Sequence, residues 1–177
     1  MITTQIDASG AVDVILNPGD FHFYCPVVGR PAPTRLRTLL GSCVSMIVWH
    51  PQSGMAGMSH AVLPSRSRRA EVVALDGRFC DEAMALLQQE LVRSGAAAQQ
   101  FHVYLVGGGQ MYQTLSGALS IGARNIDAAR KLLNQAGFLI RAEHVGREGD
   151  RKVELDLRSG YVIVTYANNS INLRTAC

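Results

Sequence analysis

The segment RTLLGSCVSMIVWH, residues 37–50, contains a break that decides how the rest of the chain is interpreted. A largely apolar run stops at Gly41-Ser42, presents Cys43, and then resumes. The two runs predict strand segments over residues 36–40 and 44–49. The small residues between them would leave the cysteine sulfur open to approach. The competing interpretation is a buried thiol that only fills space, which is the commoner role of a lone cysteine.

The residues after this break predict a hairpin that returns toward Cys43. The sequence HPQSG at 50–54 signals a turn, and the apolar run at 55–63 predicts the returning strand. His60 lies in this second run, where a hairpin would bring it back near the cysteine. An imidazole at such a position is either a general base or a core histidine bonded to a backbone carbonyl. The other histidines have no comparable placement: His22, His50, His102 and His144.

The remainder of the chain predicts further strands and two amphipathic helices. Apolar residues repeat with the period of a helix over about 81–94 and 125–136. Further strands are expected at 12–16, 21–25, 101–106, 138–144, 152–157 and 161–167. This order predicts one α/β sandwich domain over residues 1–177, with a mixed, largely antiparallel sheet. The ends, 1–11 and 168–177, are expected to be peripheral.

Composition argues against several classes of protein. Hydrophobic residues make up 47% of the chain, which is typical of a globular core, yet no run approaches the ~18 apolar residues of a membrane span. The polar start MITTQIDASG lacks the order of a signal peptide, so we expect a cytoplasmic protein that is not inserted in a membrane. The net charge of +3 and the short basic cluster at 65–69 are too weak to predict nucleic-acid binding.

The cysteines indicate neither a metal centre nor a disulfide framework. They stand at positions 25, 43, 80 and 177, and no two of them form a CxxC pair. In a reducing compartment they are expected to be free thiols.

Cysteine catalysis needs a thiolate, a nearby base and donors for a developing oxyanion. We expect a histidine within hydrogen-bond reach to raise the thiolate fraction, and Thr38 is a candidate to orient that imidazole. Taken alone, a β-branched residue at this place is better explained by strand propensity. The triple glycine at 107–109 lacks the spacing of a phosphate-binding loop, so it predicts only a close backbone approach, to a substrate or to another strand. Gly41, Ser42 and this triple glycine are therefore candidate contact residues.

Taken together, the motifs LLGSCV, GMSHAVLP, GGGQM and IGARNI resemble the CheD family of chemoreceptor glutamine deamidases. The resemblance extends over most of the chain, from about residue 15 to 160. That family is similar in fold and site to the catalytic domain of the cytotoxic necrotizing factor toxins, with a cysteine nucleophile, a histidine base and an orienting threonine. By this resemblance Cys43 is the nucleophile and His60 is the base. Thr38, the hydroxyl just before LLGSC, takes the place of the threonine.

The resemblance implies conversion of specific glutamines of methyl-accepting chemotaxis receptors to glutamate through a thioester, with release of ammonia. It implies no cofactor and no metal, and it allows hydrolysis of glutamate methyl esters as a side reaction. It also implies a CheC-type phosphatase as a partner, so a regulatory module that only binds this phosphatase is the alternative to an enzyme. A transglutaminase or thiol acyltransferase would share the acyl-enzyme step.

Overall fold

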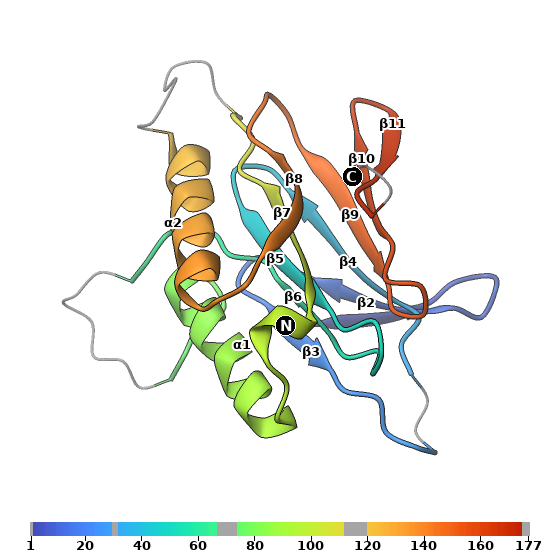
Figure 1. Ribbon diagram of the computed structural model, residues 1–177. Helices are drawn as coiled ribbons and strands as arrows, with labels where there is room; N and C mark the ends of the chain where they lie inside the picture. Colours follow the sequence, from blue (N-terminus) through green and yellow to red (C-terminus); the bar gives the residue numbers. More distant parts are fainter. Residues whose placement is uncertain (1, 30–31, 67–73, 112–119, 175–177) are drawn as a thin grey trace.

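The protein is built in three layers, as the computed structural model of residues 2–29, 32–66, 74–111 and 120–174 shows (Figure 1). Helices α1 (Cys80–Ser94) and α2 (Ile121–Gln135) cover one face of a five-stranded sheet. A six-stranded sheet packs on the opposite face of that sheet. Two features named above lie outside the described residues, namely positions 67–69 of the basic cluster and Cys177.

The two sheets have the strand orders β3-β6-β5-β7-β8 and β1-β2-β4-β9-β10-β11. Their strands are β1 (Thr3–Ile6), β2 (Val12–Leu16), β3 (Phe21–Tyr24), β4 (Arg35–Leu40), β5 (Val44–Trp49), β6 (Ala56–Ser59), β7 (His102–Gly107), β8 (Ile140–Val145), β9 (Arg151–Asp156), β10 (Val162–Tyr166) and β11 (Asn169–Asn172). A short 3-10 helix, η1 (Ala98–Gln100), precedes β7. The pairs β2–β4 and β7–β8 are parallel, and the other strand pairs are antiparallel. The predicted mixed, largely antiparallel α/β sandwich is thus confirmed, with two sheets where one was expected.

Strand β5 is buried along its whole length because both of its faces are covered. Val44, Met46 and Val48 pack into the core between this sheet and the helices. Ile47 and Trp49 point the other way, into the core between the two sheets. A strand covered on both faces needs apolar residues at every position, which explains the continuous apolar run in the sequence.

The break at Gly41-Ser42-Cys43 is the place where the chain passes from one sheet to the other. Strand β4 belongs to the six-stranded sheet and β5 to the five-stranded sheet, so these three residues form the corner between them. A side chain at Gly41 would be crowded, because its Cβ would lie 3.0 Å from the Met111 sulfur. Steric crowding at a sheet corner is one physical reason for the small residues there.

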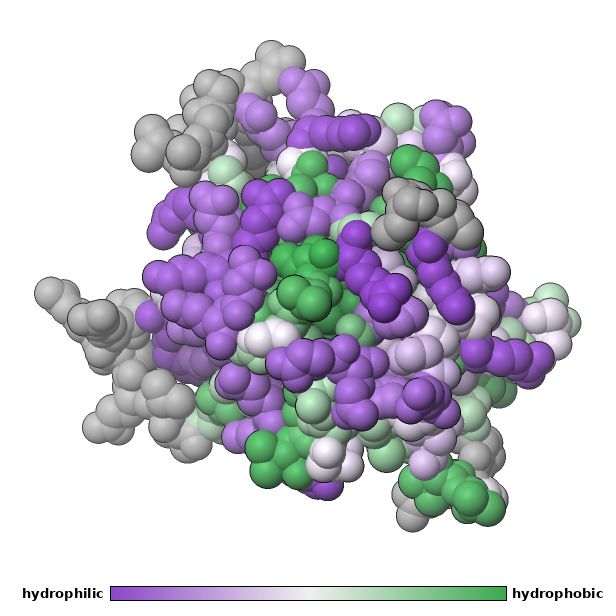
Figure 2. Space-filling model, viewed as in Figure 1, coloured by the Kyte–Doolittle hydropathy of each residue, from purple (hydrophilic) through white to green (hydrophobic). Residues whose placement is uncertain are grey.

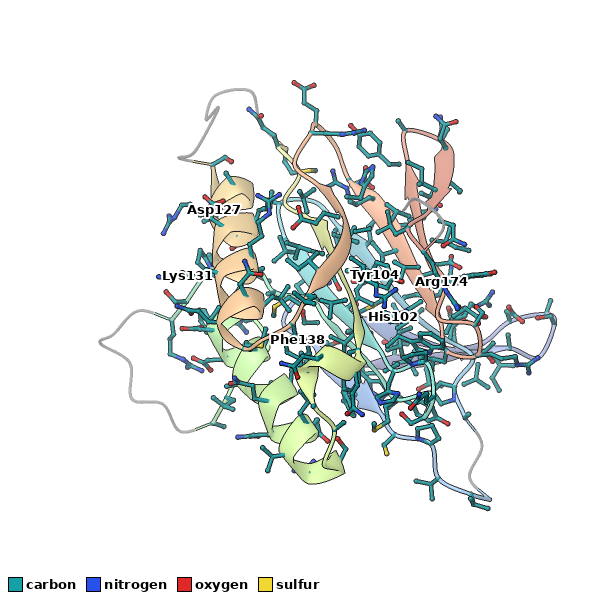
Figure 3. All side chains as sticks on the ribbon, viewed as in Figure 1. His102, Tyr104, Asp127, Lys131, Phe138 and Arg174 are labelled. Atoms are coloured by element: carbon teal, nitrogen blue, oxygen red, sulfur yellow. The ribbon has the colours of Figure 1, made fainter. Side chains whose placement is uncertain are left out.

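Helix α2 begins at Ile121, earlier than the predicted start at 125. The Ser120 hydroxyl accepts a hydrogen bond from the Ala123 N–H at 3.1 Å and so forms the N-cap. On the outer face of the helix Asp127 and Lys131 point away from the sheet, and hydrophilic side chains predominate there (Figures 2 and 3).

One other difference concerns a strand. The predicted strand over 55–63 is regular only as β6, and beyond it the chain makes isolated bridges through Ala61 and Leu63. The two end segments form the largely exposed edge strands of the six-stranded sheet, β1 and β11. Within the described ranges, neither helix combines the length and the hydropathy needed to cross a membrane.

Candidate active site

Cys43 and His60 face one cavity of about 490 Å³. The corner places Cys43 directly before β5, and His60 directly follows β6. An antiparallel bridge joins Val44 to Ala61 through two N–H···O bonds of 2.9 Å. Neighbouring residues of a strand point to opposite faces. Cys43 precedes Val44 and His60 precedes Ala61, so the side chains of Cys43 and His60 point to the same face of the sheet, opposite to the face of the bridged pair. The predicted hairpin therefore does bring the thiol and the imidazole into the same cavity.

Thr38 and the Leu16 carbonyl hold the imidazole from behind. Thr38 Oγ1 lies 2.7 Å from His60 Nδ1, and the same hydroxyl donates to the Leu16 carbonyl at 2.9 Å. A hydroxyl has a single proton, so at Nδ1 it acts as the acceptor. The Leu16 oxygen is itself 3.4 Å from Nδ1. Two acceptors at Nδ1 favour the tautomer protonated there, which leaves Nε2 of the neutral ring as the basic nitrogen.

Burial moves the two pKa values in opposite directions. Desolvation lowers the pKa of His60 below its ordinary value, although the Leu16 carbonyl and the Asp20 charge oppose it. Desolvation also raises the pKa of the Cys43 thiol, and only its own backbone N–H works against that rise. Both shifts favour uncharged groups. Burial therefore works against the raised thiolate fraction expected from sequence.

The triple glycine holds the backbone of Cys43 from the side opposite the bridge. Gly108 N–H donates to the Cys43 carbonyl at 2.7 Å, and Gly109 N–H donates to the Gly41 carbonyl at 2.8 Å. Gly107 has φ of +119°, and a Cβ there would lie 2.2 Å from the Cys43 carbonyl oxygen. The close backbone approach expected from the glycines is therefore an approach to the nucleophile corner.

Among the candidate contact residues, Gly41, Ser42 and Gly109 line the cavity. Gly107 and Gly108 are not part of its lining, since they pack behind Cys43 and against α2. The rest of the lining includes an apolar group formed by Pro18, Leu39, Met111 and Ile121. Leu39 is 54% exposed and Met111 is 47% exposed, so this apolar group is open to solvent.

Sequence reasoning assigned no role to Asn125, a fully buried residue of α2. Its Nδ2 donates to the Ser42 carbonyl at 3.0 Å and to the Val62 carbonyl at 2.9 Å. It falls four residues before Ala129 and eight before Leu133, both buried, so a polar amide occupies the apolar stripe of the helix. A polar residue inside the apolar stripe is a sequence signal for a buried hydrogen bond. The signal is hidden when the helix is predicted to start at 125, because Asn125 then stands at the helix end.

The other histidines have structural surroundings away from the cavity. His50 Nδ1 accepts from the N–H groups of its own turn, and His102 packs edge-to-face on Trp49. His144 contacts the Tyr166 ring, and His22 lies on β3 beside a different cavity.

The other described cysteines differ from Cys43 in exposure. Cys80 is fully buried, and desolvation raises its pKa to about 12, whereas Cys25 is exposed on the surface. Over the described ranges, no three histidine, cysteine or acidic side chains converge as a metal site requires.

Comparisons with known proteins agree on one family. Residues 62–166 match the family model described as CheD chemotactic sensory transduction. The chain is similar to a probable chemoreceptor glutamine deamidase CheD 1 of Chromobacterium violaceum, with 42% identity over 84% of this chain and 75% of the relative. A probable chemoreceptor glutamine deamidase CheD of Pseudomonas syringae pv. tomato is 38% identical over 89% and 90%. One from Methanococcus vannielii is 32% identical over 82% and 93%.

We predict that the Thr38 hydroxyl fixes the tautomer of His60. Thr38→Val keeps the shape of the side chain but removes the acceptor, so heteronuclear NMR of the ring should show loss of the Nδ1-protonated form. The unfolding free energy measured in urea should fall by about 1–3 kcal/mol, because a buried N–H loses its partner. Thr38→Ser keeps the hydroxyl and should behave as wild type. An unchanged tautomer in Thr38→Val would show that the Leu16 carbonyl alone fixes the ring.

The second prediction concerns pH. Because burial lowers the pKa of His60, the ring should gain its proton only below about pH 6.5, the ordinary midpoint. Because burial raises the pKa of Cys43, its alkylation by iodoacetamide should rise with a midpoint above about pH 8.5. Peptide mass analysis locates the alkylated thiol, and NMR follows the ring. Alkylation that is already maximal at neutral pH would instead indicate a thiolate–imidazolium pair.

Proposed function

The chain belongs to the CheD family, and from this premise we propose that it is a protein-glutamine deamidase acting on methyl-accepting chemotaxis receptors. The observation that carries the proposal is the arrangement of its thiol and imidazole. Cys43 and His60 share one cavity, and Thr38 and the Leu16 carbonyl fix the ring with its basic nitrogen free. The names of the relatives supply the substrate class.

In the proposed reaction His60 Nε2 takes the Cys43 proton, directly or through one water, as the sulfur attacks the glutamine carboxamide carbon. A C–S bond forms, and the carbonyl oxygen becomes an oxyanion. The tetrahedral intermediate then loses ammonia as its C–N bond breaks, with the proton returned by His60. Water attacks the resulting thioester, again with His60 as base, and the C–S bond breaks. The products are a glutamate side chain and the free thiol.

The two pKa shifts affect the steps differently. The raised pKa of Cys43 and the lowered pKa of His60 oppose the first proton transfer, whereas the lowered pKa keeps the free imidazole uncharged and able to act as a base at neutral pH. Once protonated, His60 is an acid strong enough to protonate the departing nitrogen. The Nδ1–H bond to Thr38 keeps Nε2 aimed in one direction through both transfers. A glutamate methyl ester presents the same electrophilic carbon, so ester hydrolysis is included as a side reaction.

The cavity also supports a protein substrate. Its rim offers Leu39 and Met111, two exposed apolar side chains beside the nucleophile. On a receptor helix the residues three and four positions from a glutamine lie on the same face, so apolar side chains at those positions would contact this rim. Binding energy from such neighbours helps to hold the carboxamide in place for attack. Receptors present these glutamines in the cytoplasm, where we place the protein, and we propose a CheC-type phosphatase as a further partner.

The decisive experiment uses cytoplasmic fragments of chemotaxis receptors and peptide mass analysis. We expect specific glutamines to gain the mass of a single deamidation, and Cys43→Ala to abolish the change because no thioester can form. Cys25→Ala removes an exposed thiol outside the cavity and should keep full activity. If the masses of the receptor peptides do not change with wild-type protein, the alternative of a regulatory module that only binds its partner is supported. Incorporation of an added primary amine in preference to water would identify a transglutaminase.

We further predict that the apolar rim recognises the substrate. Leu39→Glu should lower kcat/KM for a folded receptor fragment roughly tenfold, mainly through KM, because about 1.5 kcal/mol of apolar contact is lost. Leu139→Glu is the matched control, since Leu139 is 73% exposed and does not line the cavity. A short glutamine peptide should be a poor substrate for all three proteins. Equal effects of the two substitutions on the folded fragment would contradict recognition by the rim.

A further inference from the structure

Asn125 connects helix α2 to the two segments that present the nucleophile and the base. Its Nδ2 donates to the carbonyl of Ser42, the residue before Cys43, and to the carbonyl of Val62, two residues after His60. Both partners are acceptors, so the amide nitrogen, and not its oxygen, must face them. The side chain is fully buried and is not part of the cavity lining, so it would act on the reaction only through other groups.

The bond to Ser42 sets the direction of the Cys43 N–H. In a trans peptide the C=O and the N–H point in opposite directions, so holding the Ser42 carbonyl against α2 turns the Cys43 N–H away from the helix. This N–H lies against the Cys43 sulfur, where it lowers the pKa of the thiol. No described residue outside Cys43 accepts a hydrogen bond from it. The Cys43 N–H is therefore available as a donor, and it lies beside the attacking sulfur, where the oxyanion of the intermediate would form.

All three carbonyls of the corner are held in a similar way. The Gly41 and Cys43 carbonyls accept from backbone N–H groups of Gly109 and Gly108, and the middle carbonyl, of Ser42, is held by a side chain. Backbone donors survive any substitution except proline, whereas the middle bond depends on residue 125 having an amide.

The chemistry of the site explains why the residue is an asparagine. Two carbonyls must share one neutral nitrogen with two protons, which an aspartate cannot supply and a lysine would supply only with a buried charge. The amide oxygen, Asn125 Oδ1, has no donor among the described residues. A buried polar atom without a partner costs about 1–3 kcal/mol, which offsets part of what the two bonds of Nδ2 contribute to stability.

We propose that Asn125 is a positioning residue that aims the Cys43 N–H at the oxyanion formed during deamidation. This inference rests on the proposed function. In this proposal Asn125 supports stabilisation of the oxyanion, whereas Thr38 and His60 serve the proton transfers. Loss of one oxyanion donor typically lowers kcat by about 10²–10³-fold, so the same loss is expected when the donor is misdirected.

The test compares two reactions of one thiol in wild type, Asn125→Asp and Asn125→Ala. Deamidation of a receptor fragment passes through an oxyanion, whereas alkylation of Cys43 by iodoacetamide does not. We expect kcat for deamidation to fall about 10²–10³-fold, with KM and the alkylation rate at its high-pH plateau, where the thiol is fully ionised, little changed. Asn134→Asp, the same substitution at an exposed position of α2, should leave both reactions unchanged. Protection of the buried Cys80 from alkylation reports that each variant is folded.

Undiminished deamidation in a folded Asn125 variant overturns the inference, and so does a parallel loss of alkylation. If neither variant folds, NMR of wild type decides. A peptide with a glutamate semialdehyde in place of glutamine adds the Cys43 thiol and forms a tetrahedral hemithioacetal. The Cys43 amide proton should then shift downfield as it donates to the new oxygen, and an unshifted proton overturns the inference. Wild-type protein that deamidates no receptor fragment overturns the proposed function, which separates the two failures.

Discussion

The site depends on one constraint, the passage of the chain from the six-stranded sheet to the five-stranded sheet at Gly41-Ser42-Cys43. A strand that changes sheets leaves its ladder and must find other partners for its backbone groups. Here those partners come from the triple-glycine loop and from Asn125. The corner that builds the sandwich therefore also fixes the nucleophile. The φ of +119° and the close approach at Gly107 are part of the same arrangement, since any side chain there would push Cys43 away.

Burial favours the uncharged forms of the two groups that face the cavity. The imidazole loses proton affinity, and the thiol holds its proton more tightly. A thiol in this state reacts slowly with small electrophiles and oxidants, because the thiolate is the reactive form. In the reaction that we propose, proton transfer to His60 accompanies attack of the sulfur on a carboxamide carbon held in the cavity.

The groups at this cavity and behind it come from distant parts of the chain. Thr38 belongs to the six-stranded sheet, and His60 lies at the end of a strand in the other sheet. The bond between them therefore joins the two sheets beside Cys43, and Leu16 adds a third strand to the contact. Asn125 connects helix α2 to the same region through the carbonyls of Ser42 and Val62. The imidazole and the backbone of the corner are thus held by elements other than their own.

The sequence by itself determined the local parts of this arrangement. The interruption at Gly41-Ser42, the turn at 50–54 and the apolar runs on either side predicted the strands and the hairpin that bring His60 back to Cys43. Such features follow from the backbone freedom of small residues and from the periodicity of neighbouring side chains, which a single sequence records. Only the tertiary structure decided that β4 and β5 lie in different sheets and that Asn125 holds the corner. These facts depend on hydrogen bonds between residues far apart in the chain. The sequence marks Asn125 only as a polar interruption of a helical stripe and does not say which residues it bonds.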